Sequence, residues 1–335
     1  MFLNAINWHS EAWSRLTGEL GALPHALLIR GQQGIGKLEF ARLLAQALLC
    51  ESRGSRAEPC GRCPSCNWFA AGSHPDFREL APEAQQEDAD GAGDRKASVW
   101  IGVPQVRELA DFIALSSHRD GYKVILLQPA ESLNPNAANA LLKSLEEPPP
   151  RTIFLLVTHR PRYLLPTIVS RCRQVPLHTP EAALALEWLK AEGVKEPELA
   201  LAMAGGAPLG ARELAQDETY FEQRQAFLRA ISQDPFEPLA AAERLKDLPL
   251  ERMVGWLQRW SYDIAAAHAG SGPRYHPDYQ QAIRSLASSL EPRAVTAFHR
   301  AMLRLQRIVH HPLNPRLAIE SLMIGYARLR RGDAS

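Results

Sequence analysis

Residues 26–49 read ALLIRGQQGIGKLEFARLLAQALL. Ala26–Arg30 is a short apolar run, Gly31–Lys37 fits the pattern G-x-x-x-x-G-K, and Leu38–Leu49 repeats apolar residues with helical spacing. This order predicts a buried strand, a glycine loop and a helix. In such loops the backbone N–H groups surround phosphate oxygens and the lysine reaches the terminal phosphates. The candidate nucleotide-binding residues are Gly31, Gly34, Gly36 and Lys37.

Two further apolar runs, 123–127 and 152–157, predict additional strands. Continuous apolar runs are typical of parallel strands whose two faces are both covered. Helical patterns at 103–116 and 136–147 lie before these runs, and three prolines from Pro148 onward prevent the second helix from continuing. The alternation of strands and helices predicts a parallel α/β sheet.

The remainder of the chain is predicted to be all-helical. A chain of 335 residues is longer than one hydrophobic core usually supports, so several domains are expected. After Pro180 the pattern is helical, and from Thr219 onward amphipathic stretches alternate with proline breaks. We predict a P-loop domain at 1–178 with a cysteine knuckle at 50–66, a small helical domain at 179–218 and a larger helical domain at 219–335.

The glycine loop lacks the groups that bind magnesium in P-loop enzymes. Leu38 stands where the motif requires a Ser or Thr hydroxyl, although Mg²⁺ takes oxygen ligands. The strand at 123–127 is followed by Gln128 and Pro129 in place of an acidic pair, and Glu131 is shifted along the chain. The sequence therefore predicts no Mg²⁺ site and no hydrolysis. Two interpretations agree with this sequence: a loop that holds ATP or ADP without turnover, and a glycine turn that never bound phosphate. The alternative of an active ATPase or kinase would need unusual metal ligands.

Five cysteines are present, and four of them lie close together in sequence. Cys60, Cys63 and Cys66 are spaced by three residues, and Cys50 comes from the end of the preceding predicted helix. Four thiolates form a closed, tetrahedral structural site for Zn²⁺. The alternative is a group of free buried thiols, and Cys172 is expected to be such a packed thiol.

Charge gives little support for a free-standing DNA-binding protein. The formal net charge is +1, so any contact with DNA must be local or shared with partners. A zinc-containing DNA-binding protein remains a weak alternative, because Arg62 is the only basic residue between Cys60 and Cys66. The acidic segment 79–97 is predicted to be a solvated surface loop. No signal-like start or membrane-length apolar run is present, so a cytoplasmic location is expected.

Several motifs occur together in the order in which one protein family carries them. They are His25–Ile29, Gly31–Lys37, the four cysteines, Ser73–Asp76, Asn139–Pro149, Ser170–Cys172 and Leu313–Leu317. The chain resembles bacterial DNA polymerase III clamp-loader subunits, which are AAA+ proteins, and most closely those of the delta-prime type. The specific motifs cover the chain to about Leu177.

The resemblance implies a ring-assembly subunit that does not hydrolyse ATP itself. It implies an AAA+ domain with an inserted zinc knuckle, a helical lid and a helical collar that forms the oligomer. The implied partners are the gamma/tau and delta subunits and, through the complex, the sliding clamp and primer–template DNA. Arg171 of the Ser-Arg-Cys motif is implied to act in trans, on the ATP of the neighbouring subunit.

The main alternative within the family is a gamma/tau-like ATPase. Leu38, Gln128 and Pro129 argue against it, as does Leu209, which stands where an ATPase member carries a nucleotide-sensing arginine. Two further positions follow from the resemblance. Thr158 corresponds to a nucleotide-sensing position and is expected to be structural here, and Lys143 faces either the DNA backbone or solvent.

Overall fold

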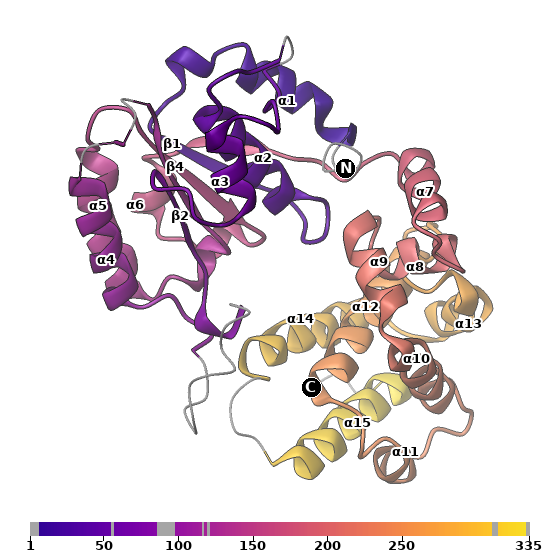
Figure 1. Cartoon of the computed structure of the whole chain (residues 1–335). Helices are drawn as coiled ribbons and strands as arrows, with labels where there is room; N and C mark the ends of the chain where they lie inside the picture. Colours follow the sequence, from indigo (N-terminus) through magenta and orange to yellow (C-terminus); the bar gives the residue numbers. More distant parts are fainter. Residues whose placement is uncertain are drawn as a thin grey trace. The chain divides into compact units, whose positions relative to one another are not determined.

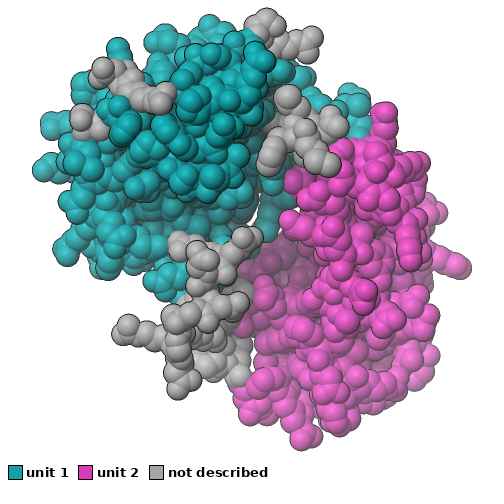
Figure 2. Space-filling view, viewed as in Figure 1, with its two compact units in different colours: residues 1–184 teal, residues 185–335 magenta. Residues whose placement is uncertain are grey.

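The computed structural model describes residues 7–54, 57–85, 98–115, 117–118, 121–309 and 314–332. Residues 86–97 of the predicted acidic loop, and Leu313 of the last family motif, lie outside the described residues. The chain divides into two compact units, residues 1–184 and 185–335 (Figure 2). No helix in the described part of the chain is long and apolar enough to cross a membrane.

The first unit is built on a five-stranded parallel sheet, which confirms the predicted fold class. The strand order is β2-β3-β4-β1-β5. The strands are β1 (Ala26–Arg30), β2 (Phe77–Leu80), β3 (Lys123–Leu127), β4 (Thr152–Thr158) and β5 (Arg173–Pro176). Strand β1 lies between β4 and β5, with Leu27 opposite both Leu155 and Arg173. The P-loop therefore leaves the sheet from an interior strand.

The helices of the first unit cover both faces of this sheet. Figure 1 shows α4 and α5 side by side on one face and α2 on the other. Apolar side chains of α4 and α5, such as Leu109 and Leu141, share a core with Ile125 and Phe154 of the strands. Helix α5 ends at Glu146, one residue before the predicted end at Glu147, and the prolines begin at Pro148. The helices are α1 (Ser10–Thr17), α2 (Lys37–Leu49), α3 (Pro64–Ala70), α4 (Val103–Ala114), α5 (Pro135–Glu146) and α6 (Pro166–Val169).

Short 3-10 helices connect several of these elements. In the first unit they are η2 (Asn7–His9), η3 (Leu20–Ala22), η4 (Glu83–Gln85), η6 (Ala130–Ser132) and η7 (Pro161–Tyr163).

The described part of the second unit is all-helical, as predicted. Its core is formed around α12, where Trp256 and Trp260 are fully buried, and Trp260 Nε1 donates to the Tyr326 hydroxyl at 3.1 Å. Met203 of α8 belongs to the same core as the later helices. The elements are α7 (Ala182–Ala191), α8 (Pro197–Met203), α9 (Pro208–Gln216), α10 (Glu218–Ile231), α11 (Pro238–Arg244), α12 (Leu250–His268), η8 (Pro277–Tyr279), α13 (Gln280–Ser289), α14 (Pro292–Ile308) and α15 (Pro315–Arg331).

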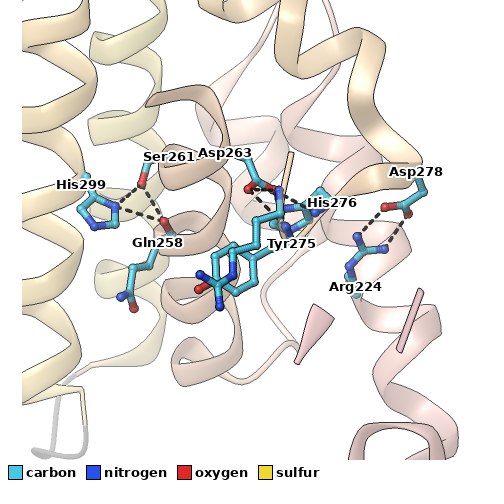
Figure 3. A network of polar contacts seen from close by, with 9 residues as sticks. Arg224, Gln258, Ser261, Asp263, Tyr275, His276, Asp278 and His299 are labelled. Atoms are coloured by element: carbon cyan, nitrogen blue, oxygen red, sulfur yellow. Dashed lines mark hydrogen bonds and ion pairs between the residues drawn. The ribbon is translucent and has the colours of Figure 1, made fainter. Parts of the chain in front are cut away.

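A buried carboxylate fixes the connection that follows α12 (Figure 3). Asp263 is fully buried and accepts hydrogen bonds from the backbone N–H groups of Arg274 and His276, each at 2.8 Å, and from Tyr275. His276 Nδ1 lies 2.9 Å from the same carboxylate, and burial lowers the pKa of His276, so the neutral ring donates. Arg224 of α10 binds Asp278 through two guanidinium nitrogens. Residues 274–278, at the end of the connection, are thus held by α12 and α10.

Replacing Asp263 by asparagine should destabilise the second unit by about 2–4 kcal/mol, because an amide leaves buried N–H donors without a charged acceptor. Urea unfolding should show a lower midpoint with an unchanged m value. Asp234→Asn is the control, because that side chain is 87% exposed in its ion pair with Arg330 and loss of its charge should cost less. Equal effects of the two substitutions would contradict this role for Asp263.

Candidate nucleotide loop and cysteine cluster

The glycine loop lies between β1 and α2, and its glycines are required by the backbone itself. Gly34 and Gly36 have φ angles of 78° and 92°, a left-handed region that favours glycine. A Cβ atom on Gly31 would lie 2.4 Å from the carbonyl oxygen of Leu177. The glycine pattern therefore follows from the loop's conformation whether or not phosphate binds.

Lys37 is buried at the start of α2, and its ammonium group donates to the Gln32 carbonyl within the loop. Burial lowers the pKa of Lys37 to about 8, while the negative charge of Glu131 opposes this shift. The lysine thus has a hydrogen-bond partner in its own loop, and Glu131 on η6 favours its charged form.

Two aromatic rings from the start of the chain cover the loop. Trp8 Nε1 and His9 Nε2 lie 3.0 and 2.8 Å from the carbonyl oxygen of Ile35. Burial lowers the pKa of His9 to about 4, so its ring is neutral at pH 7 and donates to this carbonyl. The same two residues line a cleft of about 480 Å³, together with Leu177 and His178.

The positions that hold magnesium in active P-loop proteins have other partners here. The Gln128 side chain donates to Glu79 at 3.4 Å, and Glu131 Oε1 accepts from the backbone N–H of His159 at 3.0 Å. Thr158 is fully buried, and its hydroxyl oxygen accepts from the Arg160 N–H at 3.1 Å, a contact that fits the structural role expected of it. Leu38 offers no oxygen ligand. These contacts join the segments that follow β3 and β4 to each other and to β2.

The four cysteines of the predicted knuckle come together at the other end of α2. The sulfur atoms of Cys50, Cys60, Cys63 and Cys66 all lie within 4.8 Å of one another, and those of Cys50 and Cys63 are 3.9 Å apart. A tetrahedral ion with Zn–S bonds of 2.3 Å would place its sulfurs about 3.8 Å apart. The cluster therefore has the composition and spacing to hold a metal ion.

Backbone N–H groups point at these sulfurs and favour their charged form. Cys60 N, Cys63 N and Cys66 N lie 3.3–3.4 Å from the sulfurs of Cys50, Cys60 and Cys63, respectively. The N–H groups of Arg62 and Cys63 lower the pKa of Cys60 to about 6. Burial raises the pKa of Cys50, and it raises that of Cys66 to about 12. Metal binding would deprotonate these buried thiols.

Arg171 follows α6 and lies on the surface of the first unit. Its guanidinium group pairs with Glu146 at the end of α5 at 2.5 Å and donates to the Thr167 carbonyl at 2.9 Å. Arg173, two residues later, pairs with Glu19 at 2.7 Å. The two arginines are therefore similar in exposure and pairing but belong to different ion pairs. Cys172, between them, is buried in the core, and burial raises its pKa to about 11.

The remaining predicted positions are distributed over other helices. Leu209 is buried near the start of α9, as are Pro208 and Ala211 of the same helix. The arginine on this helix is Arg212, which pairs with Glu192 and lies over the ring of Trp188. Lys143 is exposed on α5.

Comparison with known proteins gives a consistent result for both units. Residues 8–181 match the family model described as DNA polymerase III, delta subunit, and residues 218–327 match the model of its C-terminal part. The chain is 36% identical to DNA polymerase III subunit delta' of Pseudomonas aeruginosa, an alignment that covers 96% of this chain and 97% of that protein. The chain belongs to the DNA polymerase III delta' family.

The chain is also similar to other DNA polymerase III subunits. DNA polymerase III subunit delta' of Escherichia coli is 32% identical over 82% of this chain and 79% of its own length. Subunit tau of the same organism is 39% identical over only 52% of this chain and 26% of its own length. A gamma-subunit-related DNA polymerase III protein of Thermotoga maritima has the same AAA+-type fold, with a TM-score of 0.50 and 19% identity over 96% of this chain and all of that one.

In this member of the delta' family the predicted residues form three separate groups. The glycine loop and the cysteines lie at opposite ends of α2, roughly 20 Å apart for a helix of 13 residues. Arg171 is held by the end of α5. The covering rings of Trp8 and His9 were not predicted, because their contact with Ile35 spans more than 25 residues.

Proposed function

We propose that this chain is a subunit of the DNA polymerase III clamp loader that does not hydrolyse ATP itself. It assembles with gamma/tau and delta subunits, presents Arg171 to ATP bound by the adjacent ATPase, and helps the complex to place the sliding clamp on primer–template DNA during replication. Its cysteine cluster holds one structural Zn²⁺ ion through Cys50, Cys60, Cys63 and Cys66. The larger helical domain, 219–335, acts as the oligomeric collar.

The observation that carries this proposal is a P-loop without metal ligands in a chain that matches a delta' subunit along its whole length. Leu38 removes one magnesium ligand, and β3 runs into Gln128 and Pro129 without a carboxylate. The carboxylate nearest in sequence, Glu131, is bonded to the backbone at His159. A gamma/tau-like ATPase would need these ligands, and the similarity to tau covers only half of this chain.

The collar assignment is supported by the match of residues 218–327 to the C-terminal family model and by the helices of this part of the chain.

The isolated chain should not turn over ATP in the presence of Mg²⁺, because the metal ligands and the water-orienting carboxylate are missing together. Steady-state phosphate release from the purified chain should equal the background of the assay. Magnesium-dependent hydrolysis at rates above about 1 s⁻¹, abolished by Lys37→Ala, would contradict the proposal. Binding of ATP or ADP without turnover would agree with it.

A further inference from the structure

The motif Ser73–Asp76 has no role in the contacts described so far, although it lies beside the cysteine cluster. His74 and Asp76 are each about 95% buried, between α3 and β2. His74 Nε2 lies 2.8 Å from the hydroxyl oxygen of Ser65, and Ser65 Oγ donates to the carbonyl oxygen of Leu49 at 2.7 Å. The backbone N–H of Asp76 donates to His74 Nδ1 at 3.0 Å.

These contacts determine which atom donates in each of the three hydrogen bonds that link Asp76, His74, Ser65 and Leu49. Ser65 has a single hydroxyl proton, which it gives to Leu49, so its oxygen must accept from His74 Nε2–H. His74 Nδ1 then carries the lone pair that accepts from the Asp76 N–H. The result is a continuous relay from Asp76 through His74 and Ser65 to Leu49, in which each polar group is satisfied.

The relay joins the two backbone segments that carry the sulfur ligands. Leu49 is the last residue of α2 and immediately precedes Cys50, whereas Ser65 lies between Cys63 and Cys66 in the first turn of α3. The other end of the relay is fixed to the sheet. The Asp76 carbonyl accepts from Val124 N of β3, and its carboxylate accepts from His118 N at 2.9 Å.

We propose that Ser65 and His74 are positioning residues of the metal site, which hold the end of α2 and the start of α3 at the separation that lets four sulfurs share one ion. The inference rests on the proposed zinc site and does not depend on assembly into a clamp loader. Groups that orient metal ligands without touching the metal typically contribute 10–100-fold to its affinity.

The test is titration of the metal-free full chain with Co²⁺, which reports both affinity and the intensity of the visible bands typical of a tetrahedral thiolate site. Ser65→Ala and His74→Leu should bind Co²⁺ about 10–100-fold more weakly. His74→Gln, which retains an N–H donor toward Ser65, should restore most of the affinity. Ser73→Ala, at an exposed neighbouring position, is the matched control and should not change it.

The outcomes separate the inference from the zinc proposal. Wild-type affinity and spectrum in both Ser65→Ala and His74→Leu would overturn the positioning role, and so would equal weakening by His74→Leu and His74→Gln. Far-ultraviolet circular dichroism of each metal-free variant establishes that the fold is retained, and the rate of Co²⁺ loss to a chelator gives a second measure of the site. A wild-type chain that binds no Co²⁺ would overturn the zinc site and this inference with it.

Discussion

Arg171→Ala should lower ATP hydrolysis at the neighbouring subunit of the reconstituted loader by about 10³-fold or more, because an arginine that stabilises charge on the transferred phosphoryl group contributes 10³–10⁵ in rate. The subunit itself should remain folded and zinc-loaded, since the lost ion pair with Glu146 is partly exposed and such pairs contribute little to stability. Arg171→Lys should restore little activity, because an ammonium group cannot form the two parallel bonds of a guanidinium.

The control for this experiment is Arg173→Ala in the same complex. Arg173 has comparable exposure and also forms a surface ion pair, with Glu19, so its loss removes the same charge two residues away. A selective decrease in ATP turnover with Arg171→Ala supports action in trans. Equal and negligible effects of the two substitutions on ATP turnover and clamp loading would contradict it.

Cys63→Ser should remove most of the bound zinc and destabilise the region around the end of α2 and the start of α3. Cys63 caps α3 by accepting from Cys66 N, so the substitution affects both a metal ligand and a helix terminus. Structural zinc contributes about 10 kcal/mol or more to the folding of isolated zinc fingers, so loss of one thiolate should cost several kcal/mol here. Metal analysis and hydrogen exchange over residues 57–76 would measure the two effects.

Cys172→Ser provides the comparison for the zinc experiment. This thiol is also buried, but it belongs to the core beneath α4 and α5 and lies apart from the cluster. Its substitution should leave one zinc per chain. The zinc assignment would be wrong if wild-type protein, prepared without chelator or oxidant, held well under one zinc per chain.

The parts of the fold that were predictable from sequence are those determined by local pattern. Strands β1, β3 and β4 are covered on both faces, so each is a continuous apolar run. Strands β2 and β5 were not predicted, because they lie at the two edges of the sheet and their four residues, FREL and RQVP, show neither a continuous apolar run nor an alternating pattern. The cysteine cluster was predictable because Cys60, Cys63 and Cys66 follow one another at intervals of three residues.

Contacts between distant segments were not predictable in the same way. The pairing of Arg171 with Glu146 joins residues 25 positions apart, and the Ser65–Leu49 bond joins two helix ends across the knuckle. Asp263 shows the same limit, since an aspartate in an amphipathic helix gives no indication that three backbone N–H groups will surround it. Such groups become recognisable only when the tertiary structure shows their burial and partners.

The central claim is that this chain completes a clamp loader without contributing ATP hydrolysis of its own. The most direct measurement is ATP hydrolysis, stimulated by sliding clamp and primer–template DNA, in complexes of gamma/tau and delta subunits reconstituted with and without this chain. Stimulated hydrolysis should require the chain, although the chain alone hydrolyses no ATP. Stimulated hydrolysis at the same rate in its absence would contradict the account.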